Sequence, residues 1–332
     1  MNKKVLFLAA TLLVMAHVLS ACGMGLFKPK IALVLARGGL GDKAFNDGAN
    51  AGLQKAASEL GAETKTFDYQ GNDQDQIALL RQIAQGSYDP IIAIGAENVV
   101  PVDTVSKEYP RLKFVLIDAR SAGENVTSVV FNEMDGDFLA GALAALISPN
   151  GKIGYLGGAD VSVIRRIEFG FSQGVRYVNP NTKINSRFIG DKNDFSGFAK
   201  PDVAERLTTR MYEGGDEIIY AAAGGSGLGA IEAAQTLGKL IITTGSDQRW
   251  VAPEVVVTSR TKNMDDAVFS VIQQFMTGQL QTGTITLDYQ SGGIGLAPIS
   301  EELVSAEILA KFEQIRTDLD AGKIKLEPYI EQ

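Results

Sequence analysis

Short apolar runs alternate with longer helical stretches along most of this chain, and this alternation restricts its fold more than any other feature. Runs such as "KIALVL" and "FVLID" lack polar alternation and are rich in β-branched residues, so they are typical of strands buried on both faces. The stretches between them carry apolar residues at helical spacing. Strands and helices that alternate in this way form parallel sheets covered by helices on both faces. The sequence therefore predicts an α/β fold.

The predicted strands and helices can be assigned to definite residues. We expect strands at residues 30–36, 63–69, 90–95, 113–118, 125–131, 152–156, 183–189, 217–222, 240–244, 255–259 and 284–288. We expect helices between them, among others at residues 44–60, 74–84, 135–146, 163–177, 203–212 and 228–237. A similar strand–helix order occurs before and after residue 147, which indicates two units of similar design.

Two units also fit the length of the chain, because a single core rarely grows beyond about 250–300 residues. The stretch "ISPNGKIGYLGG" ends a helix and begins a new strand, and two further breaks lie near residues 243–253 and 277–283. We therefore expect an N-terminal lobe of residues 29–146 plus 248–281 and a C-terminal lobe of residues 147–247 plus 282–325. Two lobes with three crossings are typical of type I periplasmic binding proteins, whose ligand drives hinge closure. A single large doubly wound domain is the alternative.

The first residues, "MNKKVLFLAATLLVMAHVLSAC", have the features of a secretory signal. Two lysines precede an apolar stretch, and small residues come before Cys22. Residues 1–21 are therefore predicted to be a signal peptide that is too short for a stable membrane span. Leu19-Ser20-Ala21-Cys22 resembles the lipobox of bacterial lipoproteins, in which the cysteine carries lipid; an ordinary signal peptide with a chance cysteine is the alternative. We expect lipidation at Cys22 to anchor the protein in the cell envelope, on the extracytoplasmic face of a bacterial membrane.

Removal of this signal would leave a chain without histidine, because His17 is the only one, and Cys22 is the only cysteine. A Ser-His-Asp triad, a Cys-His pair and a typical zinc site are then excluded. The loss of two lysines moves the net charge from −8 to −10, with 29 basic and 39 acidic residues. Such an acidic chain argues against nucleic acid as a partner. We expect a protein that is not an enzyme and that needs no cofactor or metal.

Candidate ligand contacts follow the strands, because ligands of open α/β sheets bind beyond the carboxyl ends of the strands. The first such turn is "ARGGLGDKAFNDG", which contributes Asp42, Lys43, Phe45 and Asn46. Asp42 also suits a helix N-cap, and Phe45 shares a helical face with apolar core positions. Lys43 is a cation in the first turn of a helix, where it opposes the helix dipole, and this favours a functional use.

Two further turns of the first half add candidates. Ala96 follows the strand at residues 90–95, next to Glu97 and Asn98, and Asn98 is interpreted as a helix cap. Asp118 ends "FVLID". There it serves either as a turn former or as an acceptor for both hydroxyls of a vicinal diol, as ribose presents.

Three turns of the second half complete the candidates. "AAAGGSGLG" contains Gly224 and Gly225; it lacks the spacing of a dinucleotide fingerprint, but such a loop lets backbone amides approach a ligand. "TTGSDQ" contributes Asp247, and "TSRTKN" contributes Lys262. Candidates therefore recur at strand ends in both lobes, which favours a site between them.

These motifs, in this order, resemble the basic membrane protein family of lipoproteins, the PnrA-like nucleoside-binding proteins of ABC importers. The resemblance covers the mature chain through "GGLGDKAFND", "FVLIDAR", "NVTSVVFNEMDGDFLAGALAAL", "GKIGYLGG", "EFGFSQG", "AAAGGSGLGAIEAA", "GSDQ" and "TSRTKNMDDAV". It implies a monomeric, lipid-anchored solute-binding protein that holds a purine nucleoside between its lobes. It also implies an ABC permease and ATPase as partners.

The resemblance assigns roles to several candidates. Phe45, in the family's DKSFN-type box, would stack on the base. Asp247 and Lys262 would contact the ribose, and the glycine-rich turn at residues 224–227 would lie against the sugar. Asp118 matches a strand-end aspartate that lines the cleft.

Three positions depart from the family pattern. Ala44 replaces the usual serine of the DKSFN-type box, and Gly245 stands where a GVDSDQ form often has an aspartate. Ala36-Arg37 occupies the place of an aspartate that recognises the base edge in many members. A base N–H that loses its acceptor in this way costs about 1–3 kcal/mol. The base preference therefore stays open, and so does a ligand other than a nucleoside.

Three alternatives to a nucleoside receptor belong to other classes. A receptor for a sugar or signalling molecule would use aromatic residues near the cleft, for which Phe195, Phe198 and Trp250 are present in the sequence. A hydrolase would use Asp118 and Asp247, although no nucleophile–base pair is visible. A surface protein that binds host macromolecules would carry an extended insertion, and the sequence shows none.

Overall fold

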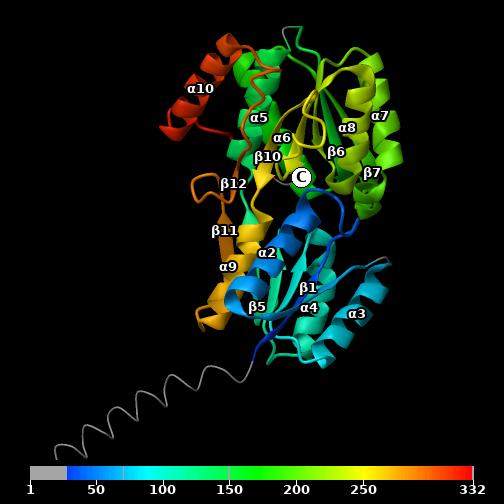
Figure 1. The fold of residues 1–332 in the computed structure, drawn as a ribbon, viewed down its shortest axis with the longest axis vertical. Coiled ribbons are helices and arrows are strands. Elements are labelled where there is room, and N and C mark those ends of the chain that lie inside the picture. The colour runs from blue at the N-terminus through cyan, green and yellow to red at the C-terminus, as the bar shows by residue number, and fades with distance from the viewer. Residues whose placement is uncertain (1–27, 70, 149, 331–332) are drawn as a thin grey trace, which may run out of the picture.

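The computed structural model describes residues 28–69, 71–148 and 150–330 and folds them into two lobes, each built on a six-stranded sheet (Figure 1). The predicted signal peptide and Cys22 lie outside the described residues. In the part of the chain that is described, no helix combines the length and the hydropathy that a membrane crossing requires. The α/β fold with two lobes is thus confirmed, and a single doubly wound domain is not what forms.

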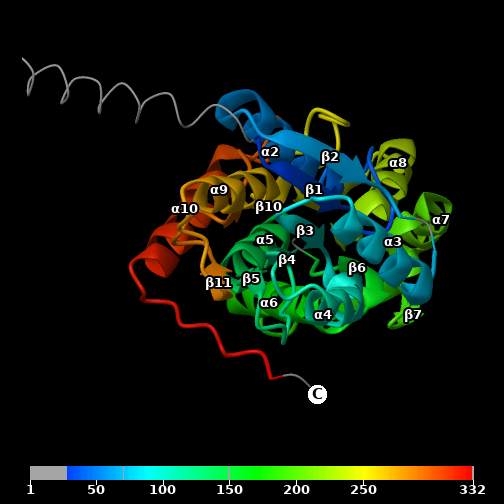
Figure 2. The ribbon, with the colours of Figure 1, turned by 90° about the horizontal axis from the view of Figure 1, so that it is seen from below.

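The first lobe contains a fully parallel sheet with the strand order β11-β5-β4-β3-β1-β2. Its strands are β1 (Lys30–Val34), β2 (Glu63–Phe67), β3 (Ile91–Ile94), β4 (Phe114–Ile117), β5 (Val126–Phe131) and β11 (Gly283–Leu287). Its helices are α2 (Phe45–Leu60), α3 (Asp73–Gln85), α4 (Val99–Glu108) and α9 (Met264–Met276). Helices α2 and α9 lie side by side on one face, and α3 and α4 cover the other (Figure 2).

Strand β1 shows why an uninterrupted apolar run fits this lobe. Ile31 and Leu33 pack under α2 and α9, whereas Ala32 and Val34 pack under α3 and α4. Successive side chains of a strand point to opposite faces, so a sheet covered on both faces needs apolar residues at every position.

The second lobe repeats this design with the strand order β12-β10-β9-β8-β6-β7. Its strands are β6 (Ile153–Asp160), β7 (Ile184–Lys192), β8 (Ile218–Ala222), β9 (Leu240–Gly245), β10 (Val256–Lys262) and β12 (Ile294–Leu296). Its helices are α5 (Met134–Ile147), α6 (Ser162–Val178), α7 (Pro201–Glu213), α8 (Gly227–Leu237) and α10 (Ala306–Asp320). The short edge strand β12, which the sequence did not predict, runs antiparallel to β10.

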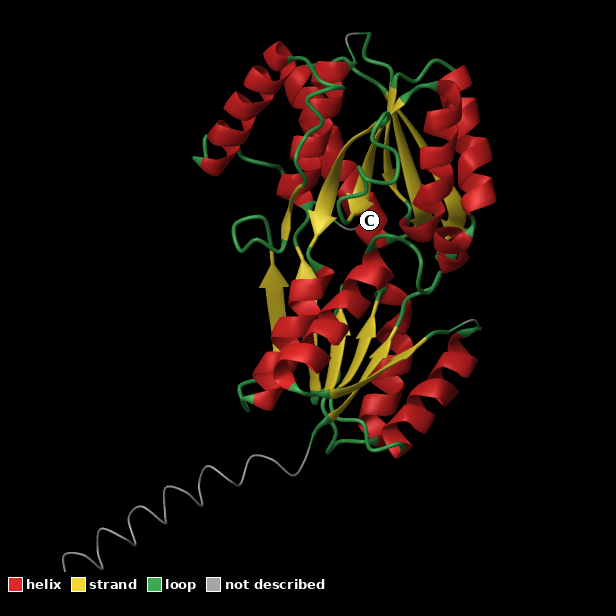
Figure 3. Ribbon diagram, in the orientation of Figure 1, coloured by secondary structure: helices red, strands yellow, loops and turns green. Residues whose placement is uncertain are grey.

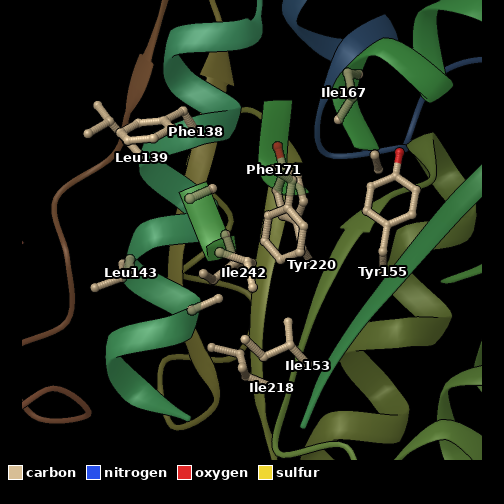
Figure 4. Close-up of a cluster of buried hydrophobic side chains, with 14 of the residues drawn as sticks. Phe138, Leu139, Leu143, Ile153, Tyr155, Ile167, Phe171, Ile218, Tyr220 and Ile242 are labelled. Atoms are coloured by element: carbon tan, nitrogen blue, oxygen red, sulfur yellow. The ribbon is translucent and has the colours of Figure 1, made fainter. Parts of the chain in front are cut away.

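The second lobe has a core cluster on each face of its sheet, one under the helix pair α5–α6 and one under α7 and α8. Phe171 of α6 stacks on Tyr220 of β8 with 4.7 Å between ring centroids, and Figure 4 shows these two rings side by side. The two helices approach closely at glycines: a β-carbon on Gly174 would lie 1.9 Å from the carbonyl oxygen of Phe138. Any larger residue at this position would push α6 away from α5.

The chain crosses between the lobes three times, as predicted, but at other positions than expected. The crossings connect β5 to α5, β10 to α9 and β11 to β12. Helix α5 and strand β10 therefore belong to the second lobe and β11 to the first, which corrects the predicted boundaries at residues 147, 248 and 282. The turn at "SPNG" only joins α5 to β6. Helix α5 is buried on nearly all sides, so its pattern does not reveal which sheet it covers.

Candidate functional site

Residues of both lobes line a cavity. The strands of both sheets end where the two lobes face one another (Figure 3). The volume of this cavity is about 100 Å³. The sequence-predicted residues that line it are Asp42, Phe45, Asn46, Ala96, Asp118, Gly224, Gly225 and Lys262. These residues come from separate turns of both lobes. The tertiary structure therefore brings together candidates that the sequence analysis had chosen because each of them follows a predicted strand.

The turn after β1 is held by side chains that accept backbone hydrogen bonds. Asp42 accepts from the amides of Ala44 at 2.9 Å, Asn46 at 2.8 Å and Asp47 at 3.1 Å. It therefore satisfies two of the free amides in the first turn of α2, although the N-cap residue itself is Ala44 and not Asp42 as predicted. Burial raises the pKa of this carboxyl group. Asn46 is buried as well, and its Oδ1 accepts from the amide of Ala36 at 2.9 Å, which ties α2 to the end of β1.

Phe45 and a buried ion pair lie next to one another in the cavity. Lys262, at the end of β10, places its Nζ 2.6 Å from Asp118 Oδ1 and 5.8 Å from the centroid of the Phe45 ring. Asp118 has a positive φ of 71°, a left-handed turn conformation that aspartate tolerates better than most residues. An aromatic face and a carboxylate are thus present within one small space.

The Lys262–Asp118 pair is part of a larger network at the crossing segments. Lys262 Nζ also donates to Glu133 Oε1 at 2.9 Å, and Glu133 Oε2 accepts from Arg166 Nη2 at 2.9 Å. Burial by itself raises the pKa of Glu133, but the charges of Lys262, Arg166 and Arg260 outweigh it and hold that pKa at about 2. Burial dominates at Asp118 and raises its pKa. The network connects residues of the two lobes.

A second acidic group of the first lobe faces the cavity. Glu97 follows Ala96, and its Oε1 accepts from the amide of Arg37 at 2.9 Å. Burial raises the pKa of the Glu97 carboxyl group. Asn98, which was interpreted as a helix cap, makes no side-chain cap; its Nδ2 donates to the carbonyl of Ile94 at 2.7 Å instead. Glu97 therefore lines the cavity, whereas Asn98 does not.

The wall from the second lobe is mainly apolar. Its apolar side chains are Val163, Ile164, Ile167, Phe195, Phe198 and Ala222. Gly224 has a positive φ of 54°, and a β-carbon there would lie 3.3 Å from the Phe198 ring. A β-carbon on Gly225 would lie 3.5 Å from the β-carbon of Asp42 in the other lobe. The glycine-rich turn thus allows the two lobes to approach closely, whereas its predicted approach to a ligand stays a prediction.

Lys43 and Asp247 are not among the described residues that line the cavity. Asp247 is held by Arg249, whose Nη2 donates to Asp247 Oδ2 at 2.7 Å. Lys43 has a left-handed backbone (φ 55°) and directs its exposed side chain to Trp250, 5.9 Å from the ring centroid. The residues of "TTGSDQ" that line the cavity are Thr244 and Gly245. The roles of Lys43 and Asp247 as ligand contacts therefore remain predictions of the sequence alone, since neither side chain lines the cavity.

Arg260 is a lining residue that the sequence analysis missed. The predicted strand ended at residue 259, so Arg260 was treated as part of a turn. In the structure β10 continues to Lys262, and Arg260 and Lys262 are two residues apart on the same face. A cation two residues before a candidate lysine in a strand was the signal that could have revealed it.

Among the described residues, no group of three or more His, Cys, Asp or Glu side chains has the geometry of a metal site.

Comparisons with known proteins show the family of this chain. Residues 28–324 match the family model for "ABC transporter substrate-binding protein PnrA-like". The chain is 29% identical to a CD4+ T-cell-stimulating antigen of Listeria monocytogenes, over 98% of this chain and 99% of that protein. It is 30% identical to basic membrane protein A of Borreliella burgdorferi, over 86% of this chain and 82% of that protein.

A solved structure supports the same fold. The solute-binding protein of an ABC transporter system from Aeropyrum pernix K1 superposes with a TM-score of 0.81 at 24% identity and covers 90% of this chain and 92% of its own. The family consists of substrate-binding proteins of ABC transporters rather than enzymes, and it works with a small ligand and with permease and ATPase partners. The chain belongs to the PnrA-like ABC transporter substrate-binding proteins.

Proposed function

We propose that this protein is the receptor of an ABC importer for a neutral nucleoside, in the first place a purine nucleoside. We further propose that it acts as a monomer, anchored by lipid at Cys22 on the extracytoplasmic face of a bacterial membrane. One observation carries the ligand assignment: the Phe45 ring lies beside the Asp118–Lys262 pair inside the interlobe cavity. A ring face suits a base, and a carboxylate next to an ammonium group suits the hydroxyls of ribose.

The charges around the cavity support a neutral ligand. Among the described lining residues, the three cations Arg37, Lys262 and Arg260 are balanced by the three acids Asp42, Glu97 and Asp118. A ligand with a phosphate or an unpaired carboxylate would bring an uncompensated charge into a small buried space, which is unfavourable. A nucleoside has aromatic, hydroxyl and amide-like groups but no net charge.

The test is a calorimetric titration of the unlipidated mature protein with adenosine, guanosine, inosine, cytidine, uridine and ribose. The protein is first unfolded and refolded to remove any bound ligand. We expect submicromolar binding of purine nucleosides and none of ribose alone, because the ring contact contributes a large share of the affinity. Phe45→Ala should weaken nucleoside binding by at least about tenfold. Binding of ribose or other sugars without nucleoside binding would contradict the proposal and favour a sugar receptor.

The proposed lipid anchor requires a separate test with the full chain in a bacterial host. Cys22→Ser should release the protein from the membrane fraction and abolish incorporation of a labelled fatty acid. Ser20→Ala is the matched control, because it alters the same segment and keeps the cysteine. A Cys22→Ser protein that stays in the membrane fraction would show that another feature holds it there.

A further inference from the structure

Arg260 is a buried cation whose hydrogen bonds to other described residues all come from one of its three nitrogens. Its Nε donates to Asp137 Oδ1 at 2.8 Å and to the Tyr220 hydroxyl at 3.3 Å. Its side chain is 2% exposed, and Nη1 has no partner in the described part of the chain. A guanidinium group has five N–H donors, and leaving donors of a buried charge unsatisfied is costly. The arrangement is therefore ready for an acceptor.

The packing around Arg260 fixes the direction of its guanidinium group. A β-carbon on Gly136 would lie 3.1 Å from Arg260 Cγ, so α5 closes over the aliphatic part of the side chain. Asp137 and Tyr220 both accept from Nε, Tyr220 also donates to Asp137, and Tyr220 is itself stacked on Phe171 (Figure 4). Such a group loses little conformational freedom when it binds a ligand.

Arg260 also lines the interlobe cavity, on the wall that comes from the second lobe. The neighbouring lining side chains on this wall include Ile164, Ile167 and Phe198, which offer apolar surface only. The hydroxyl of Thr244 already donates to the carbonyl of Ala221 at 3.1 Å. The part of a ligand that enters here is thus expected to be flat and apolar with an acceptor at its edge.

We propose that Arg260 selects the base of the ligand and favours a 6-oxopurine nucleoside over a 6-aminopurine nucleoside. This assignment rests on the proposed nucleoside-receptor function. The planar fork of arginine matches the adjacent O6 and N7 acceptors of a 6-oxopurine, which it can bind with two hydrogen bonds. A 6-aminopurine presents an N–H₂ donor at the same edge, so two donors would face one another.

Inosine and adenosine provide the test, because they differ at the base substituent that Arg260 would contact. We expect the wild-type protein to bind inosine at least about tenfold more tightly than adenosine. The informative variant combines Arg260→Met with Asp137→Asn. It removes both buried charges, so neither charge is left without its partner. The dissociation constants of this double variant for inosine and adenosine should agree within about a factor of two, chiefly because inosine binds more weakly than to the wild type. Asp137→Asn alone is the companion variant: asparagine Oδ1 can still accept from Arg260 Nε, so the preference for inosine should be kept although the lobe loses stability.

Arg260→Lys adds a variant that retains the charge and its pairing with Asp137 but lacks the planar fork. It should also lose the preference for inosine, and thermal unfolding of each variant shows whether the lobe remains folded. Equal binding of inosine and adenosine by the wild-type protein would overturn the role of Arg260, and so would a preference that persists in the double variant. Absence of binding to every nucleoside would instead overturn the proposed function, and the assignment with it.

Discussion

Ala44 and Gly245 meet across the two lobes: a β-carbon on Gly245 would lie 2.6 Å from the β-carbon of Ala44. Gly245 has a positive φ of 107°, and the carbonyl of Lys43, which precedes Ala44, accepts hydrogen bonds from Ser246 and Gln248. Ala44 and Gly245 are two of the positions at which the sequence departs from its family pattern. The departures therefore coincide at one contact that closes the cavity.

Gly245→Ala should hinder this closure. The added methyl group would collide with Ala44 and the residue would be strained at positive φ, so we expect weaker ligand binding, by about tenfold. Small-angle scattering should show a more open molecule at saturating ligand. Gly238→Ala is the control, because Gly238 also has a positive φ (59°), but a β-carbon there would have no other atom within 4 Å. Equal losses in both variants would mean that backbone strain, rather than the Ala44 contact, is responsible.

Asp118 and Asp247 can be separated by the same conservative substitution. Asp118→Asn should weaken nucleoside binding by about tenfold, because it removes a charged acceptor that lies in the cavity. Asparagine tolerates the left-handed backbone of this position, so the turn should persist. Asp247→Asn should leave the affinity within about twofold, since its carboxylate binds Arg249. Titration calorimetry distinguishes the two residues, and a larger effect at Asp247 would support its assignment by family resemblance.

Trp250 should report closure of the lobes. It is the only tryptophan of the chain, it belongs to the second lobe, and Lys43 of the first lobe lies 5.9 Å from its ring centroid. Opening would remove this cation from the ring, so we expect ligand binding to change the tryptophan emission. Lys43→Met should reduce that change while the affinity falls less than in Phe45→Ala, because Lys43 is outside the cavity. An unchanged emission in the wild type upon saturation would show that Trp250 does not sense closure.

Glu133 should make stability depend on pH in the acidic range. Its pKa is lowered from 4.5 to about 2 in the folded protein, so the unfolded chain binds more protons between these values. This group then contributes on the order of 3 kcal/mol above pH 4.5, and the contribution is lost as the pH falls toward 2. Urea unfolding should therefore show that Glu133→Gln is less stable than the wild type at pH 7. The difference between their free energies of unfolding should become smaller below pH 4.5. The control is Glu301→Gln, because Glu301 is exposed. This variant is expected to be as stable as the wild type at pH 7.

Gly174→Ala should destabilise the second lobe. The new β-carbon would lie 1.9 Å from the carbonyl oxygen of Phe138, so α5 and α6 would have to separate, at a cost of about 1–3 kcal/mol. Gly227→Ala at the start of α8 has no neighbouring atom within 4 Å and should be neutral or slightly stabilising. Differential scanning calorimetry gives both values. A Gly174→Ala protein as stable as the wild type would show that the helix pair can shift without loss.

The strand–helix alternation was sufficient to predict the α/β fold and the positions of most elements. Residues 30–36 are a case in point: the uninterrupted apolar run is required by the two covered faces of the sheet, and β1 forms at Lys30–Val34. The crossings were not predictable in the same way. Helix α5 is buried on nearly all sides, and β11 has no pattern that favours one lobe, so their partners depend on contacts between distant segments.

The sequence by itself determined which kinds of groups stand at the strand ends, because local turn chemistry and the termination of apolar runs are encoded within a few residues. This was enough for Phe45, Asp118 and Lys262. Only the tertiary structure decided which of these groups face the cavity. Asp247 turns to Arg249 and Gly245 takes its place at the cavity wall, while Arg260 enters that wall because β10 extends past residue 259. The direction of a side chain depends on its neighbours in space. Those neighbours are distant in the sequence, so the residues next to a side chain in the chain do not reveal them.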